Sequence, residues 1–154
     1  MTRNASSNWL NEVEMAAWLG FVETFADLIR AIESDLTPHG IDLGDYQVFV
    51  YLSGSVEGSM KMCDLADALQ LTPSGLTRRI DGLVSRGWVE RRPSEEDRRV
   101  NLAALTARGR KLIEEVAPGH VESVRRHMID QLTVSELKAF ASGFSRIRTG
   151  LDEE

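Results

Sequence analysis

The stretch that most constrains the fold is LTPSGLTRRIDGLVSRGWVERR, residues 71–92. Thr72 can cap the N-terminus of a helix through its side-chain hydroxyl. Pro73 suits the first helical position, because the N–H that proline lacks would have no partner there. Gly87 suits the position just beyond a helix, where left-handed backbone is common. We therefore predict a helix over about residues 73–86.

A β-hairpin is predicted directly after this helix. The segments WVERR at 88–92 and VNLAAL at 100–105 have the length of strands, and the charged segment PSEEDRR joins them. A short helix with the sequence CDLADALQ at 63–70, and then a tight turn, precede the helix at 73–86. This order of helix, turn, helix and hairpin predicts a winged helix-turn-helix over about residues 42–106.

Longer helices are predicted near both ends of the chain. Apolar residues recur there at three- and four-residue steps, a spacing that is typical of amphipathic helices. The first such helix is expected at 8–36. Asp42 can cap a second, shorter helix, and SVEGS at 55–59 is expected to be a loop. Thr106 can cap another long helix, which is expected to reach about residue 131.

The last helix is predicted from TVSE, because Thr133 and Glu136 have the spacing of a capping box. The helix before it contains Pro118–Gly119, where a kink is expected. The predicted fold class is mostly α with a small β-hairpin wing, as a winged helix-turn-helix flanked by long N- and C-terminal dimerisation helices. These helices are expected at about 8–36 and 112–151, within a single domain over residues 1–154.

Charge is distributed unevenly along the chain. The 154 residues carry a formal net charge of −6. Residues 1–60 hold two basic and nine acidic side chains, a net charge of −7. Residues 71–111 hold ten basic and five acidic side chains, a net charge of +5. Because binding depends on the local potential at the contact surface, the basic segment predicts contact with nucleic acid.

Composition also excludes several classes of protein. The sequence has no run of about 18 apolar residues, so we expect no membrane partner. The N-terminal segment MTRNASSNWLNEVE lacks the apolar stretch of a secretory signal. Cys63 is the single cysteine, so no internal disulfide can form. We therefore expect a cytoplasmic protein.

The predicted helix at 73–86 has two unlike faces at about 100° per residue. Small residues surround one long basic residue, Arg78, on the outward face. Such a face suits a major groove about 12 Å wide, in which Arg78 can donate two hydrogen bonds to a guanine, with Ser74 and Thr77 near bases or phosphates. The alternative is an ordinary solvated helix face. The core-facing side carries Leu76, Ile80, Leu83 and Val84.

The hairpin loop favours the DNA-binding interpretation. Arg98 and Arg99 lie at its tip, and arginine side chains can enter the minor groove, where the potential is most negative. Two neighbouring elements that both carry exposed arginines are harder to explain as coincidence than either one alone. The sequence thus predicts a DNA-binding surface made of the helix and the hairpin.

These residues closely resemble a known family. The helix carries Ser-x-x-Thr-Arg, the wing carries Asp-Arg-Arg, and the next helix begins with Leu-Thr-x-x-Gly. The pattern is similar to the recognition helix and wing of the MarR family of bacterial transcription regulators, and the helix order and length match over nearly the whole chain. The residues that carry it are Ser74, Thr77, Arg78, Asp97, Arg98, Arg99, Leu105, Thr106 and Gly109.

The resemblance implies a homodimer that binds double-stranded DNA at a pseudo-palindromic operator. We expect a repressor, with an activator as the alternative, because the outcome depends on where the operator lies relative to the promoter. It also implies that Asp97 pairs with a nearby arginine to hold the wing. Two departures are Gly82, where the family often has a charged residue, and Cys63, where a serine often caps the third helix. The DNA-binding residues expected are Thr72, Pro73, Ser74, Gly75, Thr77, Arg78 and Arg79 in the helix, and Asp97, Arg98 and Arg99 in the wing.

The terminal helices are too apolar to be stable in water without a partner. They either pack on each other within one chain or form a two-fold interface with a second copy. We favour the interface, because two recognition helices about 34 Å apart read more bases than one. The interface residues expected are Trp9, Leu10, Val13, Val124, Met128, Leu137, Phe140, Phe144, Ile147 and Leu151.

Many MarR family members release DNA when a small aromatic or hydrophobic compound binds between the first, second and fifth helices. The resemblance therefore implies a similar effector pocket in this chain. The alternative is that the aromatic residues in question are simply core. The residues expected to line the pocket are Trp18, Phe21, His39, Tyr46 and Phe49.

Other functions find less support in the sequence. His120 and His127 lie about 10 Å apart along one helix face and need further ligands to chelate an ion, so no metal and no cofactor are expected. Cys63 is expected to be a half-buried thiol without a redox role. The chain contains no nucleophile elbow and no phosphate-binding loop, so no enzyme activity is expected. A winged helix that binds protein instead of DNA remains the alternative function.

Overall fold

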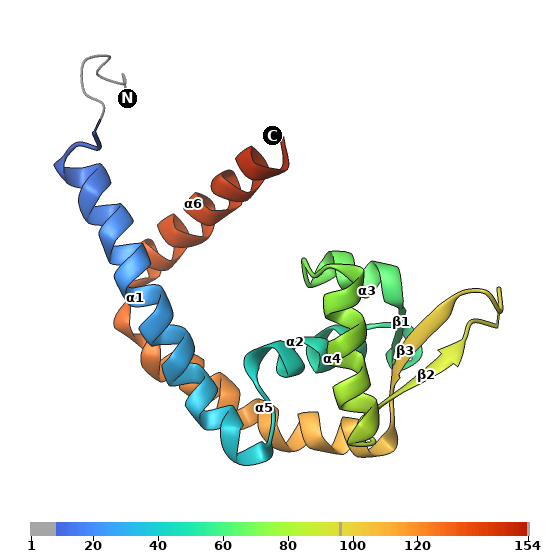
Figure 1. The fold of residues 1–154 in the computed structure, drawn as a ribbon. Coiled ribbons are helices and arrows are strands. Elements are labelled where there is room, and N and C mark those ends of the chain that lie inside the picture. Colours follow the sequence, from blue (N-terminus) through green and yellow to red (C-terminus); the bar gives the residue numbers. More distant parts are fainter. Residues whose placement is uncertain (1–8, 96, 154) are drawn as a thin grey trace. The chain divides into compact units, whose positions relative to one another are not determined.

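The computed structural model describes residues 9–95 and 97–153 (Figure 1). The chain divides into two compact units. Glu33–Ser123 form the second unit, and the described residues of Met1–Ile32 and Val124–Glu154 form the first. Among the described residues, no helix is long and apolar enough to cross a membrane.

The second unit contains the helix-turn-helix and the wing. After the end of α1 (Glu12–Leu36), the chain forms a one-turn 3-10 helix before α2 (Leu43–Gly54) and another after it. The remaining elements are β1 (Ser59–Lys61), α3 (Met62–Ala68), α4 (Pro73–Ser85), β2 (Val89–Pro93), β3 (Asn101–Leu105) and the start of α5 (Ala107–His127).

The wing is part of a three-stranded antiparallel sheet with the order β1-β3-β2. Ala103 in β3 is paired with Met60 on one side and with Arg91 on the other. The predicted hairpin is present. The prediction of a loop over 55–59 is wrong for Ser59, which is the first residue of β1. Three residues are too few to show the alternation that identifies a strand in a sequence.

Both ends of α4 follow from local chemistry. The Thr72 hydroxyl accepts a hydrogen bond from the N–H of Gly75 at 3.1 Å, and Pro73 occupies the first turn. Gly87 follows the helix with φ +73°. Glycine adopts this left-handed conformation with little strain because it has no Cβ. In the turn before α4, the N–H of Leu71 donates to the carbonyl of Ala66 at 2.9 Å.

The expectation that Cys63 occupies the cap position of the third helix is wrong. The helix begins at Met62, and Lys61 in the cap position makes no side-chain cap hydrogen bond. Cys63 therefore lies within the first turn and is exposed. Its Sγ is 3.2 Å from Oδ1 of Asp64, so the thiol faces a carboxylate and does not cap the helix.

The start of α5 is locked to the base of the wing. The Thr106 hydroxyl donates to the carbonyl of Gly87 at 2.8 Å and accepts from the N–H of Gly109 at 3.0 Å. A Cβ at Gly109 would lie 2.1 Å from the carbonyl oxygen of Trp88, so no larger residue fits there. The helix contains Pro118 and ends at His127, earlier than predicted.

The second unit encloses a continuous apolar core. Side chains from α2, α3, α4, the sheet and α5 pack together around Phe49, whose ring lies edge-on to Trp88 at a centroid distance of 6.1 Å. The buried members of the core are Leu36, Ile41, Tyr46, Val48, Phe49, Leu52, Leu65, Ala66, Leu76, Ile80, Leu83, Trp88, Val89, Ala103, Leu105, Ile113 and Val116.

The first unit is formed mainly by α1 and α6 (Val134–Asp152). The helix α1 begins at Glu12, after the N-terminal turn at Asn11, whose Oδ1 accepts hydrogen bonds from two backbone N–H groups at 3.0 Å. The predicted start at residue 8 lies outside the described residues. The predicted capping box of Thr133 and Glu136 is present at the start of α6.

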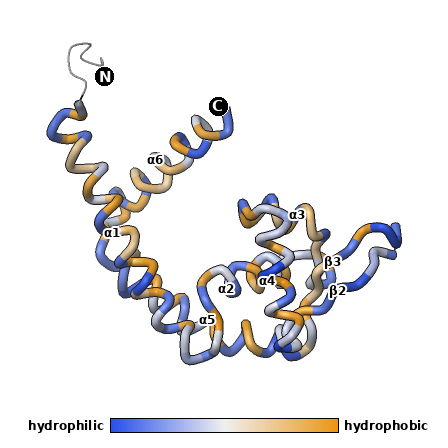
Figure 2. The backbone as a smooth tube through the Cα atoms, in the orientation of Figure 1, coloured by the Kyte–Doolittle hydropathy of each residue, from blue (hydrophilic) through white to orange (hydrophobic). Residues whose placement is uncertain are grey.

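The two helices of the first unit touch, yet they leave much apolar surface in water. Phe144 lies 6.1 Å from Phe21 and 4.6 Å from Phe140 between ring centroids, so packing within one chain does occur. Hydrophobic positions nevertheless recur along both helices (Figure 2), and many of their side chains are exposed. The exposed apolar residues include Trp9, Leu10, Val13, Trp18, Leu19, Phe21, Val22, Phe25, Val134, Phe140, Phe144, Ile147 and Leu151.

Candidate nucleic-acid interface

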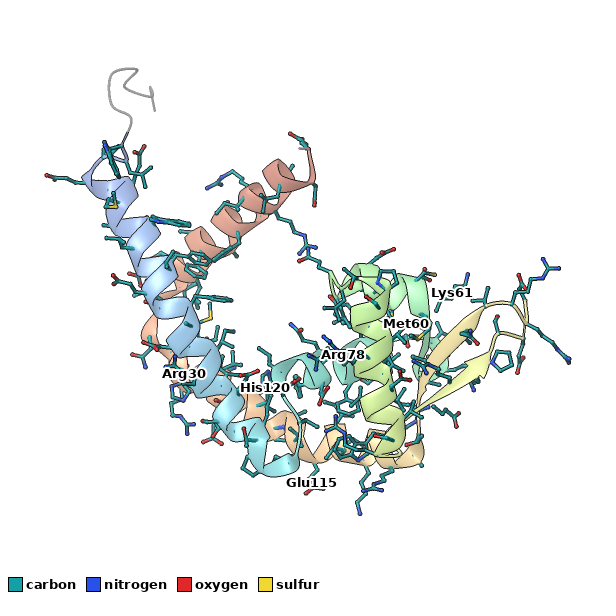
Figure 3. All side chains as sticks on the ribbon, in the orientation of Figure 1. Arg30, Met60, Lys61, Arg78, Glu115 and His120 are labelled. Atoms are coloured by element: carbon teal, nitrogen blue, oxygen red, sulfur yellow. The ribbon has the colours of Figure 1, made fainter. Side chains whose placement is uncertain are left out.

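The outward face of α4 carries the side chains expected to meet DNA. Ser74, Thr77 and Arg78 are exposed, whereas Leu76 and Ile80 are buried in the core. Arg78 projects from the α4 ribbon (Figure 3). Because the buried stripe sets the rotation of the helix, Arg78 lies on its exposed side.

The N-terminal residues of α4 have short side chains or, at Gly75, none. Pro73 is exposed, and Gly75 is half-buried with a Cβ position 3.1 Å from the Thr72 hydroxyl oxygen. The Thr72 hydroxyl already accepts from the Gly75 N–H and lies 3.3 Å from Ser74 Oγ. Thr72 is therefore mainly the cap of the helix, and the helix N-terminus stays open to an approaching phosphate.

The tip of the wing is held by Asp97 in a manner that differs from the expected arginine pair. Its Oδ1 accepts a hydrogen bond from the main-chain N–H of Arg99 at 2.9 Å, and its carbonyl accepts from the N–H of Val100 at 2.9 Å. Within the described residues, the Asp97 carboxylate forms no ion pair. Asp97 thus fixes the turn, while the outer part of the hairpin remains hydrophilic (Figure 2).

The arginines of the basic segment separate into two groups. In residues 9–95 and 97–153, the side chains of Arg78, Arg98, Arg99 and Arg108 have no hydrogen-bond or ion-pair partner, and all four are exposed. Arg108 lies in the first turn of α5, whereas the other three lie on α4 and the wing. The remaining arginines of residues 71–111 are engaged with protein groups. Arg91 bonds Asp81 and the carbonyl of Thr77, which ties β2 to α4.

Arg79 was expected to contact DNA, and the structure corrects this expectation. Its Nη1 donates to Oδ1 of Asp42 at 2.6 Å and to Oδ1 of Asp45 at 2.7 Å. Burial lowers the pKa of Arg79, but hydrogen bonds with the two carboxylates and their attraction outweigh burial and raise it. The Arg79 guanidinium therefore stays charged and is bound to the carboxylates at the start of α2.

Two further arginines brace the wing and its neighbours. Arg92 in β2 donates to Ser59 Oγ at 3.2 Å and lies 3.5 Å from the Glu57 carboxylate. Arg110 in α5 donates to the carbonyl of Glu57 at 3.2 Å. A Cβ at Gly58 would lie 2.5 Å from Nη1 of Arg110, so this glycine leaves room for the guanidinium.

The surface around α4 contains two open concavities. One, of about 240 Å³, is lined by residues of α2 and α4 that include Asp45, Arg78 and Arg79. The other, of about 470 Å³, lies between α3, α4 and the wing and includes Cys63, Thr77 and Asn101. Both flank the outward face of α4, so the recognition helix stands between two hollows of the surface.

Comparison with known proteins identifies this arrangement. A model of the MarR family matches residues 55–100. AbsC, a MarR family transcriptional regulator from Streptomyces coelicolor, is 36% identical and has a TM-score of 0.92, with 96% of this chain and 100% of that chain covered. The present chain belongs to the MarR family.

Two other MarR family relatives add detail. Sco3205 from Streptomyces coelicolor, whose crystal structure is in complex with DNA, is 29% identical with a TM-score of 0.89, covering 96% of this chain and 93% of that chain. The transcriptional repressor MprA of Escherichia coli K12 is 34% identical over 83 residues, which are 54% of this chain and 47% of MprA. The chain thus matches about half the length of MprA. Since these relatives are transcriptional regulators, the expectation that the chain is not an enzyme is confirmed.

The residues expected to form a MarR-type effector pocket do not share one environment. Trp18 and Phe21 are exposed on α1, and His39 is half-buried after it. Phe49 is fully buried against Trp88, so it belongs to the core and cannot line an open pocket. The core alternative is therefore correct for Phe49, because the apolar face of α2 packs inward.

Tyr46 meets a residue that the sequence placed in no site. Its ring lies 4.0 Å from the His120 ring between centroids, and His120 sits on α5 (Figure 3). Burial lowers the pKa of His120 and raises that of Tyr46, so both stay neutral near pH 7. Nδ1 of His120 and Oγ of Ser123 are buried and have no hydrogen-bond partner among the described residues.

Asp45 is the buried ion-pair partner of two arginines near α4 that sequence reasoning missed. It is the one charged residue between Leu43 and Val50, a segment that is otherwise apolar or uncharged. Carboxylates are common in the first turn of a helix, where they interact favourably with the helix dipole. Asp45 therefore looked like an ordinary exposed residue in the sequence, and its burial could not be predicted. Among the described residues, no group of three or more His, Cys, Asp or Glu side chains could hold a metal ion.

Proposed function

We propose that this MarR family member binds double-stranded DNA in a sequence-specific manner and regulates transcription as a homodimer on a pseudo-palindromic operator. One observation carries the proposal. Within the described chain, Arg78 on α4 and Arg98 and Arg99 on the wing are exposed without side-chain partners, although neighbouring arginines are engaged. A basic surface with unpaired donors suits a polyanion.

In this proposal, α4 enters the major groove. Arg78 donates two hydrogen bonds to a guanine, and Ser74 and Thr77 contact neighbouring bases or phosphates. Pro73 and Gly75 let the helix N-terminus approach a phosphate closely, because neither presents a bulky polar side chain. The wing places Arg98 and Arg99 at the minor groove, and Asp97 keeps the wing tip in shape.

The homodimer is supported by the apolar surface of the first unit. Trp9, just before α1, is 80% exposed and Val13 in α1 is 78% exposed, and such a gathering of exposed large apolar residues is unusual for a monomer. We propose that this surface is the dimer interface, together with half-buried residues that close it. The full set is Trp9, Leu10, Val13, Val124, Met128, Leu137, Phe140, Phe144, Ile147 and Leu151.

We also propose that residues 1–154 act as one MarR-type domain in the cytoplasm. In it, the winged helix-turn-helix at about 42–106 reads DNA, and the helices at about 8–36 and 112–151 form the dimer. Repression is the expected outcome of binding, in line with the repressor MprA. A small aromatic effector would release DNA by favouring a dimer whose recognition helices are wrongly spaced. Titration of the protein–DNA complex with small aromatic carboxylic acids tests this part.

The decisive experiment begins with selection of the preferred duplex from a random library. Fluorescence anisotropy then compares the selected and scrambled duplexes at two salt concentrations. We expect a preference of about a thousandfold or more and a steep loss of affinity with salt. Arg78→Ala is expected to weaken binding to the selected duplex by about 1–3 kcal/mol and to affect the scrambled duplex much less.

The control is Arg30→Ala, which removes an exposed arginine of α1 that is paired with Asp27. It is expected to bind both duplexes as the wild type does. If no duplex is enriched and salt has little effect, DNA binding is refuted, and a winged helix that binds protein becomes the better interpretation.

A further inference from the structure

A buried carboxylate lies behind the recognition helix. Asp45 on α2 is 5% exposed, and each of its oxygens accepts from a different arginine of the α4 region. Oδ1 accepts from Arg79 Nη1 at 2.7 Å, and Oδ2 accepts from Arg86 Nη2 at 3.0 Å. Each oxygen of the carboxylate is therefore bound by one guanidinium group.

Neighbouring groups reinforce this arrangement. Asp42 Oδ1 accepts from Arg79 at 2.6 Å and from the N–H of Asp45 at 2.7 Å, so it caps α2 and shares Arg79. Arg86 also donates to the carbonyl of Gly40 at 2.6 Å, and its guanidinium lies 4.6 Å from the centre of the Trp88 ring. The middle and the C-terminal end of α4 are thus both tied to the start of α2.

These ion pairs determine which arginine side chains of α4 remain free to bind a ligand. Arg79 follows Arg78 by about 100° around the helix, and both line the same concavity. Arg78 has no partner among the described residues, whereas Arg79 is held by two carboxylates. If it were released, Arg79 would become a second mobile cation beside the residue that reads the bases.

We propose that Asp45 is a specificity-determining positioning residue: it withholds Arg79 and Arg86 from DNA phosphates and fixes the rotation of α4 that aims Arg78. The inference rests on the proposed DNA binding. Phosphate contacts strengthen binding to every sequence equally, whereas base contacts discriminate. Withholding two arginines therefore limits the binding to DNA of any sequence, and the fixed rotation of α4 keeps the base contacts of Arg78, on which the preference for the correct site depends.

A glycine offers a way to test this without changing any charge. A Cβ at Gly44 would lie 2.5 Å from Cζ of Arg79 and 2.6 Å from its Nη2. Gly44→Ala must therefore push the guanidinium away from Asp42 and Asp45. Gly54→Ala is the matched control, because it lies on the same helix and its added Cβ would meet nothing within 4 Å.

The experiment measures anisotropy of Gly44→Ala, Asp45→Asn, Gly54→Ala and the wild type on the selected and scrambled duplexes over a range of salt. Gly44→Ala and Asp45→Asn are expected to bind the scrambled duplex more tightly and to lose about tenfold or more of the preference. Their salt slope on scrambled DNA should steepen by about two, the contribution of one added phosphate contact in each protomer of the dimer. Gly54→Ala should match the wild type.

Circular dichroism shows which variants are folded. A merely structural role would weaken binding to both duplexes in parallel and leave the slope unchanged, and this result in folded Gly44→Ala would overturn the proposal. If Asp45→Asn does not fold, Gly44→Ala decides alone. A wild type without any preference would instead refute the proposed function itself, which separates the two failures.

Discussion

The two compact units of the chain treat their apolar side chains in opposite ways. The second unit buries Phe49, Leu65, Ile80 and Leu83 completely. The first unit leaves Phe140 and Phe144 on α6 exposed, and α6 has no buried residue among those described. The second unit therefore holds its own core, whereas the first needs another surface to cover it. We infer that the second unit can fold independently of dimer formation through the first unit.

The largest expected effect comes from charging the exposed face of α6. Phe140→Asp with Phe144→Asp should convert a dimer to monomers, because four carboxylates would be desolvated in the two-fold interface. Sedimentation velocity measures the change, expected to be about a thousandfold or more in the dimer dissociation constant. Circular dichroism should show the helices and sheet of the second unit retained.

The control for this prediction places the same charge on the other unit. Val56 is 86% exposed and lies outside the proposed interface, so Val56→Asp should remain a dimer. A dimer that persists in the double Phe variant would mean that the apolar faces of α1 and α6 are not where two copies meet.

A smaller effect is expected from the core of the second unit. Leu83→Ala removes a fully buried side chain and should lower the free energy of unfolding by about 2–5 kcal/mol. Denaturant unfolding followed by Trp88 fluorescence measures it. Leu151→Ala, at a side chain that is 68% exposed, should leave that unfolding transition in place. Equal losses would show that the two units fold as one.

The smallest effect concerns pH. Burial lowers the pKa of His120 in the folded state below its ordinary value of 6.5, so the unfolded chain binds this proton more readily. Stability from neutral His120 is fully present above pH 6.5 and is lost as pH falls from that value through the lower pKa of the folded state. His120→Gln should flatten the melting temperature between about pH 7.5 and 5 relative to the wild type, and His127→Gln, at an exposed residue, should not.

Helix ends were predictable because their causes are local. The caps at Thr72, Thr106 and Thr133 and the glycine at 87 depend on residues three or four positions away. The strand at Ser59–Lys61 was missed because its partner is β3, more than forty residues later in the chain. Only folding shows such a pairing.

The site was predictable to the same extent. Exposure of Arg78 followed from helical periodicity, since its opposite face is apolar. The role of Arg79 did not, because its partners lie 34 and 37 positions earlier. The position of a residue on a helical wheel shows whether it faces outward. It does not show whether its side chain forms an ion pair with another element.

Gly44 and Gly58 have a consequence for how such a regulator diverges. Each leaves a space that an arginine guanidinium fills. A larger residue at Gly44 would break the ion pairs of Arg79 with Asp42 and Asp45 but would leave the fold in place. Under the proposed DNA binding, single-codon mutations there would yield proteins that are still made and still assembled but discriminate less sharply between promoters. Gene duplicates could widen their sets of target promoters by this route without passing through an inactive intermediate.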